Sequence, residues 1–150
     1  MNPKRFLFVC TGNSCRSVMA EKLFKKLVAD RGLAWEALSC GTAATRAMGV
    51  PSGVKKALAA NDVQVMAHMS RSISANLLAW ADLALVMSTE HLEAAVKNFP
   101  EHSGKVKLFL SHVGMPDPDI ADPIGKADQE YAVCCARIRQ GLEALIKKYA

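Results

Sequence analysis

The sequence predicts an α/β fold, an open and mostly four-stranded parallel sheet with helices on both faces. Short apolar runs alternate with segments in which apolar residues recur at helical spacing, which is typical of such sheets. The chain has 150 residues, of which 51% are hydrophobic and 22% are charged. This composition excludes a disordered chain and a low-complexity chain. No long linker or internal repeat divides the sequence, so we expect one domain over residues 1–150.

The first unit is predicted to be a strand, a polar loop and a helix. Residues 5–9 form a short apolar run, as in a strand buried on both faces. The loop of residues 10–16 follows. Ser17 is then expected to cap a helix that extends to Gly32, with apolar residues on one face.

The middle of the chain continues the alternation. Residues 35–40 read as a strand, and residues 41–52 as a loop that contains Gly49 and Pro51. A short helix is expected at 54–60 and ends at the turn residues Asn61 and Asp62. Residues 73–81 have a helical pattern, and residues 84–87 form another buried strand.

The last third supplies two more helices and a strand. Thr89 is expected to cap a helix that ends near residue 99, and residues 106–110 read as a strand. Three prolines place a loop at 111–126. Residues 127–149 have a long apolar stripe and end with Lys147 and Lys148, as suits the C-terminus of a helix.

Charge and cysteine content limit the partners. The net charge is +5, which suits an anion site, but the basic residues are scattered and aromatic residues make up only 6%. We therefore expect no nucleic-acid partner. No apolar run is long enough for a membrane span or a signal peptide, so we expect a cytoplasmic protein without a membrane partner. The five cysteines are then expected to be reduced thiols.

The loop after the first strand carries the chemistry, because ligands bind at the carboxyl ends of parallel strands. The start of a helix and Arg16 both favour a thiolate at Cys10, which is a nucleophile. Loop N–H groups can form a nest for phosphoryl oxygens, and Gly12 and Asn13 tolerate positive φ. The Arg16 fork can hold two of these oxygens, and Ser17 can donate a hydrogen bond to the thiolate.

Two other readings of this loop are an inert buried cysteine and a zinc site. Cys10 and Cys15 would be two zinc ligands, but no second nearby pair completes the set, because Cys134 and Cys135 are adjacent on a predicted helix. We expect no metal. No organic cofactor is needed either, because the nest and Arg16 carry the phosphate charge.

The loop resembles that of the low-molecular-weight protein tyrosine phosphatases, whose relatives are the bacterial arginine phosphatases and the thioredoxin-coupled arsenate reductases. The resemblance is close at residues 9–21 and continues at 39–42, 68–71, 122–125 and 131–137. It implies a three-layer fold and a phosphatase that forms a phosphocysteine intermediate. Its substrates would be phosphorylated proteins or peptides, and inorganic phosphate, sulfate or vanadate would inhibit it.

The resemblance also implies roles for individual residues. Cys10 would be the nucleophile, Arg16 would bind the phosphoryl group and Asp122 would be the general acid and base. The phosphate loop would comprise Thr11, Gly12, Asn13, Ser14, Cys15 and Ser17, with Ser39 and His68 as partners of Asn13. Cys15 would also form a reversible disulfide with Cys10. Asp122 is favoured over Asp117 and Asp119 because it precedes the last helix and is followed by Pro-Ile-Gly. His91, His102 and His112 are expected at the surface.

The substrate stays open between two classes. Ile124 and Gly125 stand where other members carry aromatic residues, and Ser14 is a small hydroxyl residue, as in arginine phosphatases. Phosphotyrosine proteins are the first expectation and phosphoarginine proteins the alternative. Arsenate reduction lacks its second cysteine pair between residues 41 and 133. A redox-sensing module that only binds a phospho-ligand is the remaining alternative, and Cys10, Arg16 and Asp122 together argue against it.

Overall fold

The structure, a computed structural model, describes residues 2–44, 49–65 and 67–150. One parallel sheet has the strand order β2-β1-β3-β4. Its strands are β1 (Arg5–Cys10), β2 (Glu36–Gly41), β3 (Leu83–Val86) and β4 (Val106–Leu108). The predicted open, four-stranded sheet is confirmed. Part of the loop expected at 41–52 lies outside the described residues.

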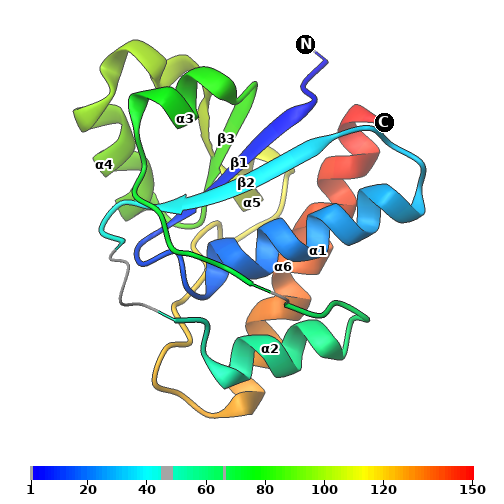
Figure 1. The fold of residues 1–150 in the computed structure, drawn as a ribbon. Helices are drawn as coiled ribbons and strands as arrows, with labels where there is room; N and C mark the ends of the chain where they lie inside the picture. The colour runs from blue at the N-terminus through cyan, green and yellow to red at the C-terminus, as the bar shows by residue number, and fades with distance from the viewer. Residues whose placement is uncertain (1, 45–48, 66) are drawn as a thin grey trace.

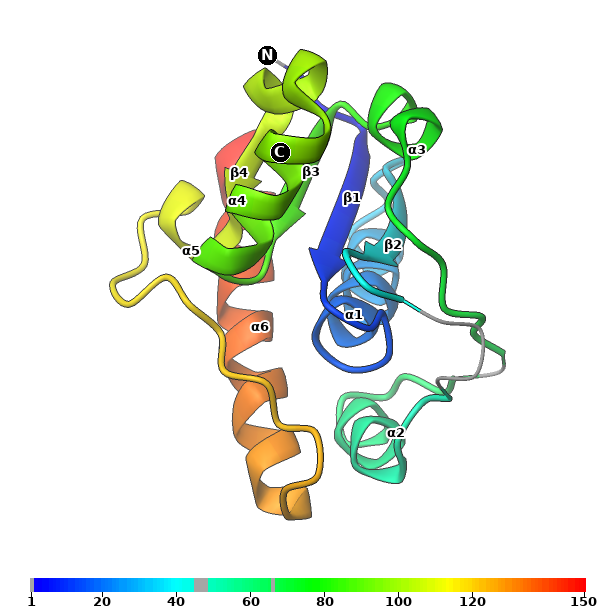
Figure 2. The same cartoon turned by 90° about the vertical axis from the view of Figure 1, so that its left-hand side faces the viewer.

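Helices cover both faces of this sheet (Figures 1 and 2). One face carries α1 (Arg16–Asp30) and α6 (Asp128–Tyr149), and α2 (Ser52–Ala59) packs against α6. The other face carries α3 (Ala75–Trp80) and α4 (Thr89–Asn98). A 3₁₀ helix, η1 (Pro100–Lys105), and a short helix, α5 (Phe109–His112), flank β4. The strand expected at 106–110 is therefore too long, because Phe109 and Leu110 start α5.

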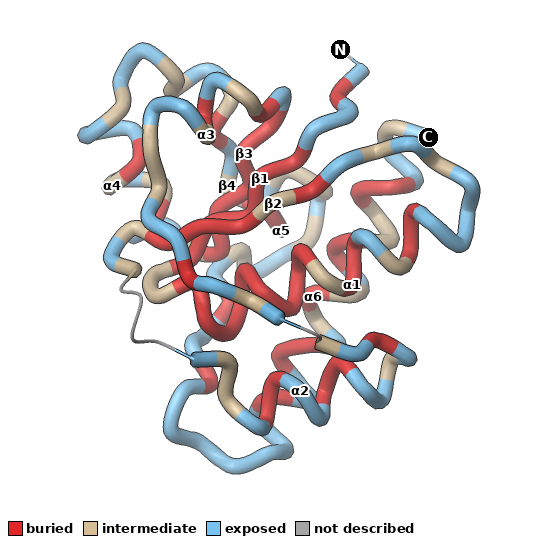
Figure 3. Tube along the Cα trace, in the orientation of Figure 1, coloured by how far each residue is buried: buried red, intermediate tan, exposed pale blue. Residues whose placement is uncertain are grey.

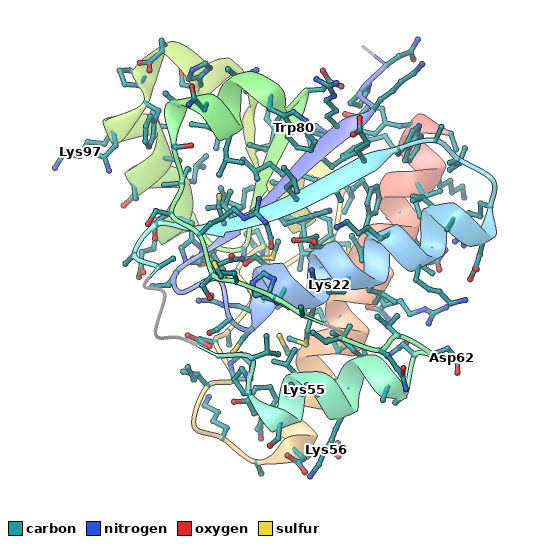
Figure 4. All side chains as sticks on the ribbon, in the orientation of Figure 1. Lys22, Lys55, Lys56, Asp62, Trp80 and Lys97 are labelled. Carbon is teal, nitrogen blue, oxygen red and sulfur yellow. The ribbon has the colours of Figure 1, made fainter. Side chains whose placement is uncertain are left out.

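The sheet separates two apolar cores, which explains the continuous apolar run of β1. Phe6 and Phe8 point to the side of α1 and α6, whereas Leu7 and Val9 point to the side of α3 and α4. All four residues are fully buried, and the trace is coloured as buried along most of β1 (Figure 3). A strand covered on both faces has no polar side to alternate with. At the margin, Trp80 at the end of α3 lies beside Arg5 (Figure 4).

Two predicted helix caps are wrong. Cys15 is the N-cap of α1, so Ser17 lies inside the helix, and Ser88 rather than Thr89 is the N-cap of α4. In both cases the hydroxyl has another partner, described below. Other boundaries differ from the expected ones by one or two residues. No helix within the described residues is long and apolar enough to cross a membrane.

Candidate active site

The loop between β1 and α1 closes tightly over the start of the helix. Cys10 ends β1 and Arg16 begins α1. Positive φ occurs at Asn13 (54°), which is fully buried, and not at Gly12. Asn13 is one of the few residues that adopt this conformation with little strain. The loop therefore bends at its buried amide side chain rather than at its glycine.

The end of β2 supports this loop from the side. The Thr42 N–H donates to the Cys10 carbonyl and the Ala43 N–H donates to the Thr11 carbonyl, each at 2.9 Å. Gly41 makes the close approach possible. A Cβ on this residue would press against the Thr11 carbonyl oxygen and lie 2.9 Å from the Asn13 nitrogen. A glycine is therefore needed where the second strand meets the loop.

The Asn13 amide orients the hydrogen bonds beneath Cys10. The Cys10 Sγ lies 2.9 Å from the Ser17 Oγ, and the Asn13 Nδ2 donates to that same oxygen at 2.8 Å. The Asn13 Oδ1 accepts from the Arg71 N–H at 3.1 Å, which fixes the orientation of the amide. Because Ser17 accepts from Asn13, its own hydrogen is available for the sulfur.

Glu21 anchors the other end of this chain. The Asn13 Nδ2 also donates to the Ser39 Oγ at 2.9 Å, and Ser39 donates to the Glu21 Oε1 at 2.6 Å. Lys22 and Lys25 donate to the Glu21 Oε2 at 2.9 and 2.7 Å. Burial alone would raise the pKa of Glu21, but the bonds from Lys25, Ser39 and Lys22 outweigh it and lower the pKa to about 2. Glu21 is therefore an ionised acceptor at the end of this hydrogen-bond chain. The sequence analysis did not predict this role, and the only signal for it was an acidic residue on the buried face of α1.

The main-chain carbonyl of Asn13 is held by two more side chains. Ser70 donates to this oxygen at 2.8 Å, and the His68 Nε2 lies 3.0 Å from it. Burial lowers the pKa of His68, which favours the neutral ring. The carbonyl can only accept, so Nε2 carries the proton. The structure therefore places His68 and Ser39 on opposite sides of Asn13, one at the main chain and the other at the side chain.

Arg16 is buried with one edge unpaired. Its Nη1 donates to the Ile120 carbonyl at 2.9 Å, and its Nη2 lies 3.5 Å from the Asp122 Oδ2. Within the described part of the chain, its Nε is the one buried side-chain nitrogen or oxygen without a hydrogen-bond partner. A buried guanidinium donor is costly unless it is paired. This N–H fits an oxyanion, because a guanidinium binds phosphate through adjacent N–H groups.

Of the three candidate acids, Asp122 alone makes a contact with Arg16. Asp119 accepts from the Thr89 N–H and hydroxyl at 2.7 and 2.9 Å, which lowers its pKa and fixes it at the start of α4. Asp117 is exposed and pairs with Arg137. The carboxyl of Asp122 is 41% exposed, so it can meet both a substrate and water.

Ser14 and Cys15 are both buried in the loop, with the Ser14 Oγ 3.7 Å from the Cys15 Sγ. Burial raises the pKa of Cys15 to about 11, so it is a neutral thiol at physiological pH. Cys134 behaves in the same way, with its pKa raised by burial to about 12. In the described residues, no group of three or more His, Cys, Asp or Glu side chains is arranged to hold a metal ion.

The expectation for His91 is wrong. This residue is buried (1% exposed), and its Nε2 lies 2.7 Å from the Thr11 Oγ1. Its Nδ1 lies 2.9 Å from the Ser88 Oγ. Burial and the nearby Arg16 lower the pKa of His91 to about 4. No sequence pattern predicted this role for His91, because its contact with Thr11 joins residues 80 positions apart. His102 and His112, which were also expected at the surface, are half-buried.

Comparison with known proteins adds to this geometry. The family described as "Low molecular weight phosphotyrosine protein phosphatase" matches residues 5–150. A protein-arginine-phosphatase of Geobacillus stearothermophilus is 34% identical over 148 residues, which are 99% of this chain and 95% of that protein. Arsenate reductase 1 of Bacillus cereus is 36% identical over 149 residues, 99% of this chain and 96% of that protein. The crystal structure of a low molecular weight protein tyrosine phosphatase from T. tengcongensis has a TM-score of 0.92 at 32% identity, covering 96% of this chain and 98% of that one.

Proposed function

Because the chain belongs to the low molecular weight phosphotyrosine protein phosphatase family and is a protein phosphatase of that type, we propose that Cys10 is its nucleophile. The Cys10 thiolate attacks phosphorus and forms a phosphocysteine. Asp122 donates a proton to the leaving oxygen. In the second step, Asp122 accepts a proton from water as that water attacks phosphorus, and the sulfur leaves as a thiolate.

The observation that carries this proposal is the contact of 2.9 Å between the Ser17 Oγ and the Cys10 Sγ. A hydrogen bond donated by Ser17 would stabilise the negative charge of the sulfur before attack and when the sulfur leaves. The Arg16 Nε and the loop N–H groups would hold the phosphoryl oxygens, with Thr11, Gly12, Asn13, Ser14 and Cys15 as the loop. As charge spreads over those oxygens in the transition state, these bonds should tighten.

The test is a burst experiment with p-nitrophenyl phosphate. The wild type should release p-nitrophenol with turnover, and Cys10→Ser should abolish it. Arg16→Lys keeps the charge but loses the fork, so kcat/KM should fall strongly. Phosphate, sulfate and vanadate should inhibit competitively. Absence of turnover in the wild type would favour a module that only binds a phospho-ligand.

For the substrate, we propose phosphotyrosine proteins or peptides as the first class and phosphoarginine proteins as the second. The family supports the first. The arginine-phosphatase relative and the small Ser14 support the second. Close to Asp122 in the sequence, Ile124 is 47% exposed but aliphatic, and Gly125 has no side chain. Neither residue can therefore stack on a phenyl ring as an aromatic side chain would. Matched phosphotyrosine and phosphoarginine peptides, compared by kcat/KM, decide between the classes.

Cys15 is proposed as the redox partner of Cys10. Peroxide would oxidise the Cys10 thiolate to a sulfenic acid, and the neutral Cys15 thiol would condense with it, releasing water and forming a disulfide. A cellular thiol would reverse the reaction. The five free cysteines suit a reducing compartment such as the cytoplasm. Arsenate reduction is the less supported alternative, because residues 41–133 contain no second cysteine pair. Formation of arsenite by the wild type would establish it.

A further inference from the structure

The first turn of α4 is connected to both halves of the proposed site. Thr89 binds Asp119, and the Ile120 N–H donates to the Met87 carbonyl at 3.0 Å. The Ile120 carbonyl in turn accepts from Arg16. His91, on the same turn, contacts Thr11 in the phosphate loop. The helix lies on β3, on the face of the sheet opposite α1 (Figure 2). The Ile120 carbonyl thus contacts the guanidinium directly, whereas His91 is connected to it through Thr11.

Two tautomers of His91 are compatible with the hydrogen bonds that connect α4 to Arg16. A neutral imidazole has one N–H, so only one of the two His91 nitrogens donates. The Arg16 Nη2 can only donate, and it lies 3.4 Å from the Thr11 Oγ1. If the His91 Nδ1 donates to Ser88, then Thr11 donates to Nε2 and its oxygen faces Arg16. In the other tautomer, Nε2 donates to Thr11 and Ser88 donates to Nδ1. In both cases His91 contacts the hydroxyl oxygen that faces the Arg16 Nη2.

We propose that His91 is a positioning residue, which acts through Thr11 to set the orientation of the Arg16 guanidinium. The inference rests on the proposed phosphatase function and adds a residue from outside the loop to it. In the arrangement that we propose, the His91 Nδ1 carries the proton and Nε2 accepts the Thr11 hydrogen, which leaves the lone pairs of that oxygen for the Arg16 Nη2. This contact and the Ile120 carbonyl hold opposite ends of the guanidinium, and the unpaired Nε edge then has a fixed direction.

Two amide variants of His91 and two variants of Thr11 together test this role. In His91→Gln the side-chain amide reaches the place of Nε2 and keeps a contact with Thr11. In His91→Asn the amide reaches only the place of Nδ1, so the contact with Ser88 is kept and the one with Thr11 is lost. Thr11→Val removes the hydroxyl at nearly constant volume, and Thr11→Ser restores it. Packing alone would also favour glutamine, which is closer to histidine in volume, so the Thr11 variants and the comparison of two inhibitors carry the distinction.

The experiment measures inhibition of p-nitrophenyl phosphate hydrolysis by vanadate and by phosphate. Vanadate adopts the five-coordinate geometry of the transition state, so it depends more on the direction of Arg16. We expect His91→Asn to weaken vanadate binding about fivefold to tenfold, as for one hydrogen bond, and phosphate binding less. His91→Gln should stay near wild type, and the combination of His91→Asn with Thr11→Val should be no worse than Thr11→Val alone.

Three results would overturn the positioning role in an active enzyme: equal losses for Gln and Asn, equal losses for the two inhibitors, or losses that multiply in the double variant. A long-range ¹H–¹⁵N spectrum of the full chain gives an independent check. It should show the proton of His91 on Nδ1, and a proton on Nε2 would contradict the arrangement. An inactive wild type would instead refute the phosphatase proposal, and the positioning role would fall with it.

Discussion

Replacing Glu21 by glutamine tests the charge that anchors the hydrogen-bond chain beneath Cys10. Glu21 is 2% exposed, and its pKa falls from an ordinary 4.5 to about 2 in the folded protein. A shift of that size corresponds to about 3 kcal/mol of folding free energy at neutral pH. Lys25 is half-exposed, so salt screens part of its interaction with Glu21. We therefore expect Glu21→Gln to lower the free energy of unfolding by about 2–3 kcal/mol at pH 7.

The sign of the pH dependence follows from the lowered pKa. The contribution of Glu21 is complete above pH 4.5 and is lost as the pH falls toward 2. Urea unfolding of the wild type and of Glu21→Gln should therefore show a gap, which is the difference between their free energies of unfolding. This gap should be constant from pH 7 to 5 and should shrink below pH 5.

Glu36→Gln is the matched control for this experiment. Glu36 also pairs with a cation, Arg5, at 3.2 Å, but its side chain is 61% exposed, so the loss should stay below about 1 kcal/mol. A gap for Glu21→Gln that does not change with pH would refute the reasoning, because the loss would then come from shape and not from charge. So would a gap no larger than that of Glu36→Gln.

Four further predictions concern activity. Asp122→Ala should reduce kcat more for alkyl phosphates than for p-nitrophenyl phosphate, since poor leaving groups need the proton; equal losses would place the acid elsewhere. Ser14→Ile should raise the kcat/KM ratio of phosphotyrosine over phosphoarginine peptides by replacing a polar contact with apolar bulk, and an unchanged ratio would contradict this. Gly41→Ala should lose activity and about 1–3 kcal/mol of stability, measured by urea unfolding, because its Cβ meets loop backbone; a stable, active variant would argue against that contact. Cys15→Ser should recover less activity than wild type when peroxide is followed by thiol, and equal recovery would exclude the protective disulfide.

The fold was predictable because its signals are local. The alternation of apolar runs and helical periods requires only neighbouring residues, and it indicated four strands and their helices. The predicted boundaries were less accurate where a side chain hydrogen-bonds to a distant residue instead of capping its own helix. Ser17 and Thr89 resemble caps in the sequence, yet their hydroxyls contact Cys10 and Asp119, which are brought close only in the folded chain.

Residues 10–17 were enough to predict the proposed chemistry, because a cysteine, a bend, an arginine and a hydroxyl at fixed spacing form one continuous loop. How that loop is held depends on contacts that form only on folding. Glu21, Ser39 and Arg71 set the direction of hydrogen bonding below Cys10, and His91 approaches Arg16 through Thr11 from another helix. These contacts join segments that are far apart in sequence, and the direction of each hydrogen bond depends on which neighbours can only donate or only accept. No local pattern contains that information.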